Sequence, residues 1–338
     1  MSIEKHLEKM ILGKWPCFYD EEPPKNIDFN ILSSFVSRDL KLSPAIIFAN
    51  AVTTDKKKPV FIIKMQRDPA VDIVKLSLEH EFKALQTMSK NNIFARFVPS
   101  PVFSGVMEGH MLNVETIIKG TTLNDLLVGV ASREDVSLHL RKVLILLKDL
   151  YFSTYVSDES YSNFCSRFLS PELNMFSDVL KDYSVYFKGY FSFDEKNVVL
   201  PLYSQHGDFF VSNILFDKHE ISGIIDFEDF SAKGLPMGDL YNFLITYIFS
   251  LKRTGVDKKL NFGDWFIDLV GGIVSDYAKN AKIPEEVHDD LFRAYVLHSI
   301  NREMGPRRNN LELARFLMNS FKDKPKNVFD FMKSYLNM

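Results

Sequence analysis

The sequence is poor in cysteine and has no excess of basic residues, and both absences narrow the classes of protein it can encode. Its 338 residues include two cysteines, Cys17 and Cys165, which cannot form a disulfide framework and lie in no C-x-x-C or Cys/His cluster of the kind that holds zinc. Lys and Arg total 41 against 44 Asp and Glu, so the positive charge expected of a nucleic-acid-binding protein is missing. We expect neither a disulfide-stabilised scaffold nor a nucleic-acid partner.

Long hydrophobic runs are also missing. Residues 1–15 mix charges among their apolar side chains and contain no uninterrupted signal-peptide core. The longest apolar stretch, residues 240–251, is interrupted by Asn242, Thr246 and Ser250 and is shorter than the roughly 20 residues that a membrane helix needs. We therefore expect a cytoplasmic protein with no membrane partner.

Glycine and proline are too few for a fibrous or disordered chain. With 15 Gly, 14 Pro, 46% hydrophobic and 25% charged residues, the composition is that of an ordinary globular protein. No repeat of fixed period is visible, and no linker rich in Gly, Ser or Pro divides the chain. The length suffices for one large domain or two ordinary ones, each with its own core.

The first 118 residues predict a small sheet with one crossing helix, preceded by an N-terminal extension. Residues 1–40 favour two short helices, the second over the apolar cluster at 31–36. Apolar side chains at helical spacing, Leu76 among them, predict a helix over 72–90. Polar turns separate short β-branched and aromatic runs that predict strands over 45–52, 60–65, 101–105 and 111–118.

The remainder of the chain is mainly helical by its periodicity. The predicted helices cover 136–155, 171–180, 237–252, 265–281, 285–304 and 311–321. One interruption, residues 203–230, contains two short strands and the loops around them. We therefore expect an N-terminal helical extension over 1–40, a sheet-and-helix domain over 41–118 and a mainly helical domain over 119–338.

Three polar residues within this interruption have the types and spacing that phosphoryl transfer requires. Asp208 precedes a strand, Asn213 comes five positions after Asp208, and Asp226 comes 13 positions after Asn213. A tight hairpin between the two strands would bring Asn213 and Asp226 to the same end of the ribbon. One carboxylate could then accept the proton of an attacking hydroxyl while a carboxylate and an amide oxygen hold Mg²⁺.

The same segment resembles a known family of small-molecule kinases. His206-Gly207-Asp208 with Asn213 matches an H-G-D-x-x-x-x-N catalytic loop, and Ile225-Asp226-Phe227 matches the I-D-[FW] metal motif. A later G-x-P-x-x-D-L segment ends at Asp239-Leu240. Over about residues 40–250 the sequence resembles the aminoglycoside phosphotransferase and choline kinase-like group. The resemblance implies an α+β, bilobal protein-kinase-like fold, with a small antiparallel-sheet lobe and a mainly helical lobe.

The resemblance implies a role for each residue of the motif. Asp208 would be the catalytic base, and Asn213 and Asp226 would ligate Mg²⁺. His206 and Asp239 would brace the catalytic loop rather than take part in the chemistry.

Upstream residues match the nucleotide-binding positions of that group. Lys64, in a predicted strand, resembles the lysine that contacts the α- and β-phosphates, and Glu81 resembles the helix glutamate that fixes it, in preference to Glu79. Glu115 would begin the hinge whose backbone meets the adenine. Residues 41–60 contain no glycine, so the segment at Ser43 would cradle the phosphates in place of a glycine-rich loop.

The expected function is therefore an ATP-dependent, Mg²⁺-dependent transfer of the γ-phosphoryl group to a hydroxyl of a small polar metabolite such as a sugar or amino alcohol. An aminoglycoside or other antibiotic is an alternative acceptor, and a nucleotide-binding pseudokinase acting through a protein partner is an alternative of another class. Residues 251–338 carry more Lys and Arg than Asp and Glu, which argues against a polycationic acceptor. Arg302, Arg307 and Arg308 could hold an anionic or sugar substrate, or compensate a helix dipole. ATP or GTP as donor and the oligomeric state stay open.

Overall fold

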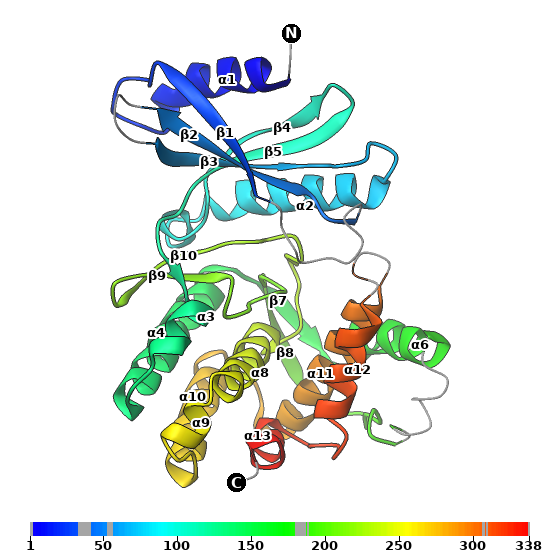
Figure 1. Ribbon diagram of the computed structural model, residues 1–338. Helices are drawn as coiled ribbons and strands as arrows, with labels where there is room; N and C mark the ends of the chain where they lie inside the picture. The colour runs from blue at the N-terminus through cyan, green and yellow to red at the C-terminus, as the bar shows by residue number, and fades with distance from the viewer. Residues whose placement is uncertain are drawn as a thin grey trace. The chain divides into compact units, whose positions relative to one another are not determined.

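The chain forms two compact units, and each is described by itself. The computed structural model describes residues 3–32, 42–52, 57–179, 187, 189–305, 308 and 310–336. The sheet unit comprises Met1–Lys119 and Ser222–Glu228, and the helical unit comprises Gly120–Ile221 and Asp229–Met338. Figure 1 labels most of the elements of both units.

A five-stranded antiparallel sheet forms the centre of the sheet unit, in the order β1-β2-β3-β5-β4. Its strands are β1 (Asn26–Leu32), β2 (Ala45–Val52), β3 (Lys57–Met65), β4 (Pro101–Met107) and β5 (His110–Thr116). Val, Ile and Phe are frequent in β2 and β3, as expected of strands that pack between two layers. A tight turn at Glu108 and Gly109, both with positive φ, joins β4 to β5.

Helices cover both faces of this sheet (Figure 1). Helix α1 (Ile3–Lys14) buries Leu7 and Ile11 against one face, in a cluster that includes Phe61 and Ile63 of β3. Helix α2 (Asp72–Met88) lies on the other face, where Leu78 belongs to a second buried cluster. Because successive side chains of a strand alternate between faces, neighbouring residues of β3 are buried on opposite sides of the sheet.

The predicted second helix of the N-terminal extension is wrong where the structure describes it. Residues 26–32 form β1, whose Ile31 pairs with Ile47 of β2 and is 71% exposed. The run Asn-Ile-Asp-Phe-Asn-Ile alternates polar and apolar side chains, and this period of two decides for a strand. The rest of the predicted helix, positions 33–36, lies outside the described residues. Leu76 also departs from prediction, because it is 61% exposed on α2.

The helical unit contains short strand pairs among helices. Its helices are α3 (Leu123–Leu126), α4 (Arg133–Ser153), α5 (Tyr161–Phe164), α6 (Ser170–Val179), α8 (Gly238–Arg253), α9 (Val256–Lys259), α10 (Asp264–Asn280), α11 (His288–Met304), α12 (Leu311–Ser320) and α13 (Val328–Leu336). The strands of this part of the chain are β6 (Thr121–Thr122), β7 (Tyr155–Ser160), β8 (Val199–Tyr203), β9 (Ile214–Asp217) and β10 (Glu220–Ile224), and the division between the units falls within β10. β6 pairs with β9, and β7 pairs with β8.

Helix α8 is the buried centre of the helical unit. Leu240, Phe243, Leu244 and Tyr247 are almost completely inaccessible to solvent, so the longest apolar stretch of the sequence is core.

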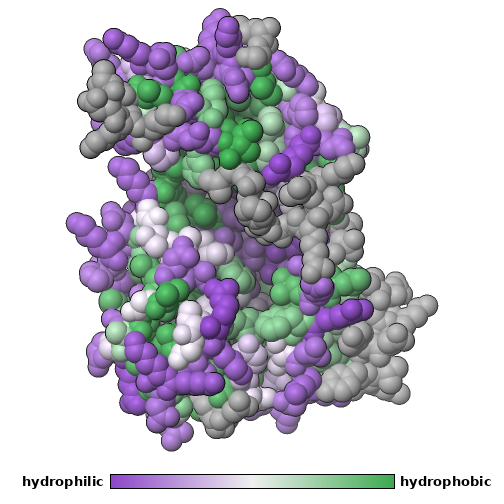
Figure 2. All heavy atoms as spheres, viewed as in Figure 1, coloured by the Kyte–Doolittle hydropathy of each residue, from purple (hydrophilic) through white to green (hydrophobic). Residues whose placement is uncertain are grey.

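No helix within the described residues is long and apolar enough to span a membrane. Hydrophilic side chains cover most of the face drawn in Figure 2, with apolar ones in small groups between them.

The expected α+β class is confirmed, with a small antiparallel sheet, one helix crossing it and a mainly helical remainder. The strands predicted upstream of residue 118 and the long helices predicted after residue 136 are present. The β7–β8 pair was not predicted, because Tyr155-Val-Ser-Asp-Glu-Ser160 is largely polar and does not look like a buried strand.

Candidate functional site

Strand β3 places Lys64 on the sheet face that α2 covers. Lys64 is 9% exposed, while its neighbour Ile63 is buried on the α1 face. The Lys64 ammonium forms a hydrogen bond to Glu81 of α2. Its Nζ also lies 3.8 Å from Glu115 Oε1 and 3.7 Å from Asp226 Oδ1. One cation of the sheet unit therefore stands among three carboxylates that come from a helix, a strand and a returning loop.

The charges of this cluster shift the pKa values of its members. Burial by itself would lower the pKa of Lys64, but Glu115, Glu81 and Asp226 outweigh it and raise that pKa well above its ordinary value. Burial raises the pKa of Glu115 to about 8, because Lys64 compensates the lost hydration only in part. The site therefore holds a permanent cation and, near neutral pH, one carboxyl group that is largely protonated.

The segment Ser222–Glu228 returns to the sheet unit and carries Asp226 into it. Ile224 N donates to Phe97 O (2.7 Å), and a side chain at Gly223 would collide with Ile118. Ser77 on α2 donates to Glu228 Oε2 (3.3 Å). Asp226 itself has a left-handed backbone with φ 69°, a conformation that residues with a Cβ rarely adopt. Such strain is typical of functional positions whose surroundings fix them.

The remaining residues expected in the sheet unit have different surroundings. Ser43 lies in a half-buried bend two residues before β2. Glu115 pairs with Ile62 and Pro101 in the strand ladders, so its backbone belongs to the sheet and its side chain is the group that meets Lys64. Glu79 is partly exposed on α2, two residues from the buried Glu81.

In the helical unit, Asp239 at the start of α8 fixes the loop that carries Asp208. The Asp239 carboxylate accepts hydrogen bonds from His206 N (2.9 Å) and Gly207 N (3.0 Å). Burial raises the pKa of Asp239, while His206 and these backbone donors act in the opposite direction. His206 Nδ1 accepts from Asp208 N (3.2 Å), and Asn213 Nδ2 donates to Asp208 O (3.0 Å). The loop is thus held by hydrogen bonds on both sides of Asp208.

Glycine is required within this loop. Gly207 has φ +82°, and a Cβ at this position would lie 2.0 Å from the carbonyl oxygen of Asp229. An L-residue would therefore meet both a strained dihedral angle and a backbone atom that has no freedom to move aside. The glycine of the H-G-D motif is explained by this close approach.

Two arginines engage the carboxylate of Asp208. Arg302 Nη1 on α11 donates to Asp208 Oδ1 (2.9 Å), and Arg308 Nη2 donates to Asp208 Oδ2 (3.0 Å). Arg308 also donates to Asp229 Oδ2 (2.7 Å), and both guanidinium groups approach the buried Glu303. Burial would raise the pKa of Asp208, but Arg302 and Arg308 hold it well below its ordinary value. Asp208 is therefore an oriented carboxylate that is ionised near neutral pH.

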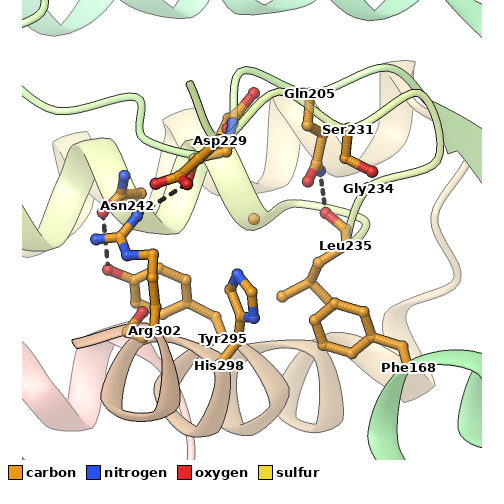
Figure 3. Close-up of a pocket in the computed structure, with 14 residues that line it drawn as sticks. Phe168, Gln205, Asp229, Ser231, Gly234, Leu235, Asn242, Tyr295, His298 and Arg302 are labelled. Carbon is orange, nitrogen blue, oxygen red and sulfur yellow. Dashed lines mark hydrogen bonds between the residues drawn. The ribbon is translucent and has the colours of Figure 1, made fainter. Parts of the chain in front are cut away.

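A cavity of about 110 Å³ lies next to this loop within the helical unit. Arg302, Asn242 and Tyr295 lie together at one side of it, and Phe168 and Leu235 at the other (Figure 3). Tyr295 donates its hydroxyl to Asn242 Oδ1 (3.2 Å). The lining combines aromatic faces with polar groups, a composition suited to a small polar ligand.

The structure thus gathers the sequence-predicted residues in two sets. Lys64, Glu81, Glu115 and Asp226 meet in the sheet unit, with Ser43 in the bend before β2. Asp208, Asn213, His206 and Asp239 meet in the helical unit. Asn213 and Asp226, expected at one end of a hairpin, therefore belong to different units.

Sequence reasoning missed two features of the second set. The contacts of Arg302 and Arg308 with Asp208 join residues about 100 positions apart, and no local pattern announces them. Gln205, which donates to Leu235 O beneath the loop, gives no signal in the sequence beyond its place next to the H-G-D motif.

The oxygen atoms required for Mg²⁺ are present in the residues that the resemblance implies. The Asp226 side chain is 40% exposed, whereas those of Glu81 and Glu115 are 3% exposed, so Asp226 is the accessible carboxylate of its set. The Asn213 amide nitrogen binds Asp208 O, which leaves Oδ1 as the atom able to ligate a cation. Carboxylate and amide oxygens are suitable ligands for Mg²⁺.

Comparison with protein families gives a match to the segment around Asp208. Residues 189–260 match the model of the phosphotransferase enzyme family, APH. The match contains Asp208, Asn213, Asp226 and Asp239, and it confirms the resemblance to this family inferred from the H-G-D and I-D-F motifs. A comparison with curated proteins gave no match.

Several solved structures are similar to this chain at low sequence identity. APH(2″)-IIa, in a ternary complex with streptomycin and ATP, is 14% identical with a TM-score of 0.48 over 98% of each chain. APH(3″)-Id from Streptomyces rimosus, in complex with ADP and streptomycin, is 13% identical with a TM-score of 0.49, over 90% of this chain and 100% of that one. An aminoglycoside 3′-phosphotransferase of type VIII is 14% identical with a TM-score of 0.49, over 86% and 98%.

Proposed function

We propose that the protein is a small-molecule kinase that transfers the γ-phosphoryl group of ATP to a hydroxyl of a small polar acceptor. The observation that carries this proposal is the loop around Asp208, held by Asp239 and Asn213 in the segment that matches the phosphotransferase family. In this proposal the sheet unit binds the nucleotide and the helical unit binds the acceptor.

The helical unit supplies the group that acts on the acceptor. Asp208 orients the acceptor hydroxyl and receives its proton as the oxygen attacks the γ-phosphorus. The bond from the γ-phosphorus to the bridging oxygen breaks, and ADP leaves. A carboxylate of lowered pKa is a weak base, but a loose transition state needs alignment and a late proton acceptor more than basicity.

The sheet unit supplies the charge that holds the triphosphate. Lys64 is a permanent cation whose position is fixed by Glu81, and it would contact the α- and β-phosphates as a point charge. The backbone near Ser43 would face the phosphates. Asp226 and Asn213 would hold Mg²⁺, which when bound neutralises the negative charge that accumulates on the transferring group.

Asp208→Asn tests this function. The amide keeps the size of the side chain but removes the proton acceptor, so we expect Mg²⁺-dependent phosphorylation of an acceptor to fall at least about 100-fold. The measurement is ADP release from ATP across sugars, amino alcohols, nucleosides and aminoglycosides. The matched control is Asp217→Asn, an equivalent change at the exposed end of β9.

Two results would contradict the proposal. Transfer that persists in Asp208→Asn would remove Asp208 from the chemistry. Tight binding of ATP that ignores Mg²⁺, with no transfer to any acceptor, would instead support the nucleotide-binding pseudokinase, and thermal unfolding with ATP in the presence and absence of Mg²⁺ measures that binding.

A further inference from the structure

The acceptor-facing carboxylate is paired with two cations, which Glu303 and, in the case of Arg308, Asp229 also contact. Asp208 contacts a guanidinium at each of its oxygens, from Arg302 at 2.9 Å and from Arg308 at 3.0 Å. The two arginine side chains are 15% and 23% exposed, so neither is freely hydrated. Any hydroxyl that hydrogen-bonds to Asp208 must therefore lie within a few ångströms of both cations.

The positions of these cations are fixed by buried partners. Glu303 is 2% exposed and lies 3.4 Å from Arg302 Nε and 3.3 Å from Arg308 Nη1. Arg302 also donates to Gly207 O (2.9 Å). A guanidinium held in this way keeps its direction when one of its partners is exchanged, because the remaining contacts fix it.

The cavity beside Arg302 is lined by two buried donors that make no hydrogen bond among the described residues, although Glu303 Oε1 lies 3.4 Å from one of them, Arg302 Nε. Among the described residues, Arg302 Nε and Asn242 Nδ2 are buried and donate no hydrogen bond. Asn242 is 4% exposed, and both residues line the cavity, where Figure 3 shows them side by side. Buried donors of this kind require an acceptor, and the oxygens of a bound ligand would supply it.

We propose that the acceptor of the phosphoryl transfer is a hydroxylated anion, with a carboxylate or phosphate group near the reacting hydroxyl, and that Arg302 and Arg308 bind that group. This inference rests on the proposed function and names its substrate class. A cationic acceptor would meet two like charges next to Asp208, whereas an anion would form bidentate, charge-assisted hydrogen bonds with a guanidinium.

Binding of the anion would also release Asp208. Each guanidinium that donates to the incoming anion in place of Asp208 frees an Asp208 oxygen, which then becomes able to accept a hydrogen bond from the acceptor hydroxyl. The chemical step is unchanged: the hydroxyl oxygen bonds to the γ-phosphorus, ADP leaves, and the proton passes to Asp208.

Charge-matched acceptors test the inference. The sugar series is glucose, glucosamine and glucuronate, with glucose 6-phosphate as the phosphate member, and the three-carbon series is glycerol, serinol, glycerate and glycerol 3-phosphate. In whichever series is phosphorylated, we expect kcat/KM for the anionic acceptors to be at least ~10-fold higher than for the neutral acceptor. It should be at least ~100-fold higher than for the cationic acceptor. Comparison of the carboxylate members with the phosphate members shows which of the two anionic groups the site prefers.

Arg302→Gln separates substrate binding from support of Asp208. If Arg302 binds the anion, the ratio of kcat/KM for anionic over neutral acceptor falls at least ~10-fold in the variant, through a higher KM for the anion. If Arg302 only positions Asp208, both acceptors lose activity equally and the ratio is unchanged, which would overturn the inference. Arg315→Gln, the same change at an exposed position on α12, is the control.

The outcomes distinguish this inference from the proposed function. Phosphorylation that favours neutral or cationic acceptors supports the kinase and overturns the anionic acceptor. Phosphoryl transfer to no member of either series contradicts the proposed function. In that case, calorimetry of glucuronate and glucose 6-phosphate binding tests whether the anion site exists. Binding that weakens in Arg302→Gln but not in Arg315→Gln supports the site, and no binding overturns it.

Discussion

Lys64 shows how a single cation organises the candidate nucleotide site. Both faces of the sheet are covered by helices, so Lys64 on β3 is largely shielded from bulk water and its charge is compensated by acids. The sequence predicts the lysine and Glu81 by position, but not the approach of Glu115 and Asp226. Those contacts depend on the register of β3 with β5 and on the return of the chain after residue 221.

Removal of this cation should destabilise the protein. Lys64→Met leaves the buried Glu81 and Glu115 without their partner, and breaking a buried pair in this way costs about 3–5 kcal/mol. Urea unfolding measures the change in the free energy of unfolding. Lys58→Met removes an exposed lysine of the same strand and should change that free energy by less than about 0.5 kcal/mol. Equal losses in both variants would refute the buried-pair argument.

The raised pKa of Glu115 predicts a pH-dependent stability. A carboxyl with a pKa of about 8 in the folded protein binds its proton more tightly there than in the unfolded chain. Its contribution to stability is complete below the ordinary glutamate pKa and is lost as the pH rises towards about 8. Glu115→Gln cannot ionise at this position. Its free energy of unfolding should therefore increase relative to that of the parent as the pH rises over this range.

Urea unfolding of parent and variant at several pH values between 5 and 9 measures the Glu115 effect. Glu108→Gln, at the exposed turn between β4 and β5, should follow the parent at every pH. A constant difference between Glu115→Gln and the parent would show that Glu115 has an ordinary pKa.

At the scale of elements, the loop before β9 is fixed by its own His206 and Asn213 together with side chains from distant helices. Its motif identifies Asp208 and Asn213 at once, because both have fixed offsets in a short segment. The anchors Asp239 on α8 and Arg302 on α11 lie 31 and 94 residues after Asp208. Whether Asp239 and Arg302 reach the loop depends on how α8 and α11 pack. Helical periodicity in the sequence does not predict that packing. β1 was missed for a related reason, since its pairing with β2 outweighs a local apolar cluster.

Gly207→Ala should disrupt this loop far more than the same change at another left-handed glycine. Gly255 has φ +73°, and no atom of the described residues lies within 4 Å of an added Cβ, whereas Gly207 has φ +82° and a backbone oxygen 2.0 Å away. We expect Gly255→Ala to cost about 1 kcal/mol of unfolding free energy and Gly207→Ala at least about 2 kcal/mol more, with loss of phosphotransfer. Similar effects in both variants would show that only the dihedral angle matters.

At the scale of the whole molecule, the two units have separate cores and separate tryptophans. Trp15 is buried in the sheet unit, and Trp265 packs on Phe262 and Phe266 in the helical unit. The sequence contains two tryptophans in all, so each reports on one unit. The sequence predicts the change from sheet to helices near residue 118. It gives no sign that Ser222–Glu228 belongs with the sheet.

Nucleotide should stabilise mainly the unit that contains Lys64. With Trp265→Phe, fluorescence follows Trp15, and Mg²⁺ with ATP at 100 times its Kd should raise the free energy of unfolding by about 2.7 kcal/mol. With Trp15→Phe, fluorescence follows Trp265, and the shift should be smaller. The Lys64→Met background should abolish the shift. A larger shift at Trp265 would assign the nucleotide to the helical unit.

The division of the sheet unit also has a consequence for synthesis on the ribosome. Its first part ends at Lys119, but Asp226 arrives only after a further hundred residues of the helical unit have been translated. Until Glu228 has left the exit tunnel, the nascent sheet lacks Asp226, one of the three acids that face Lys64, and the loop packed on Phe97. The sheet unit therefore cannot reach its final form as an early, independent folding event, and its completion waits until the loop around Asp208 has been synthesised.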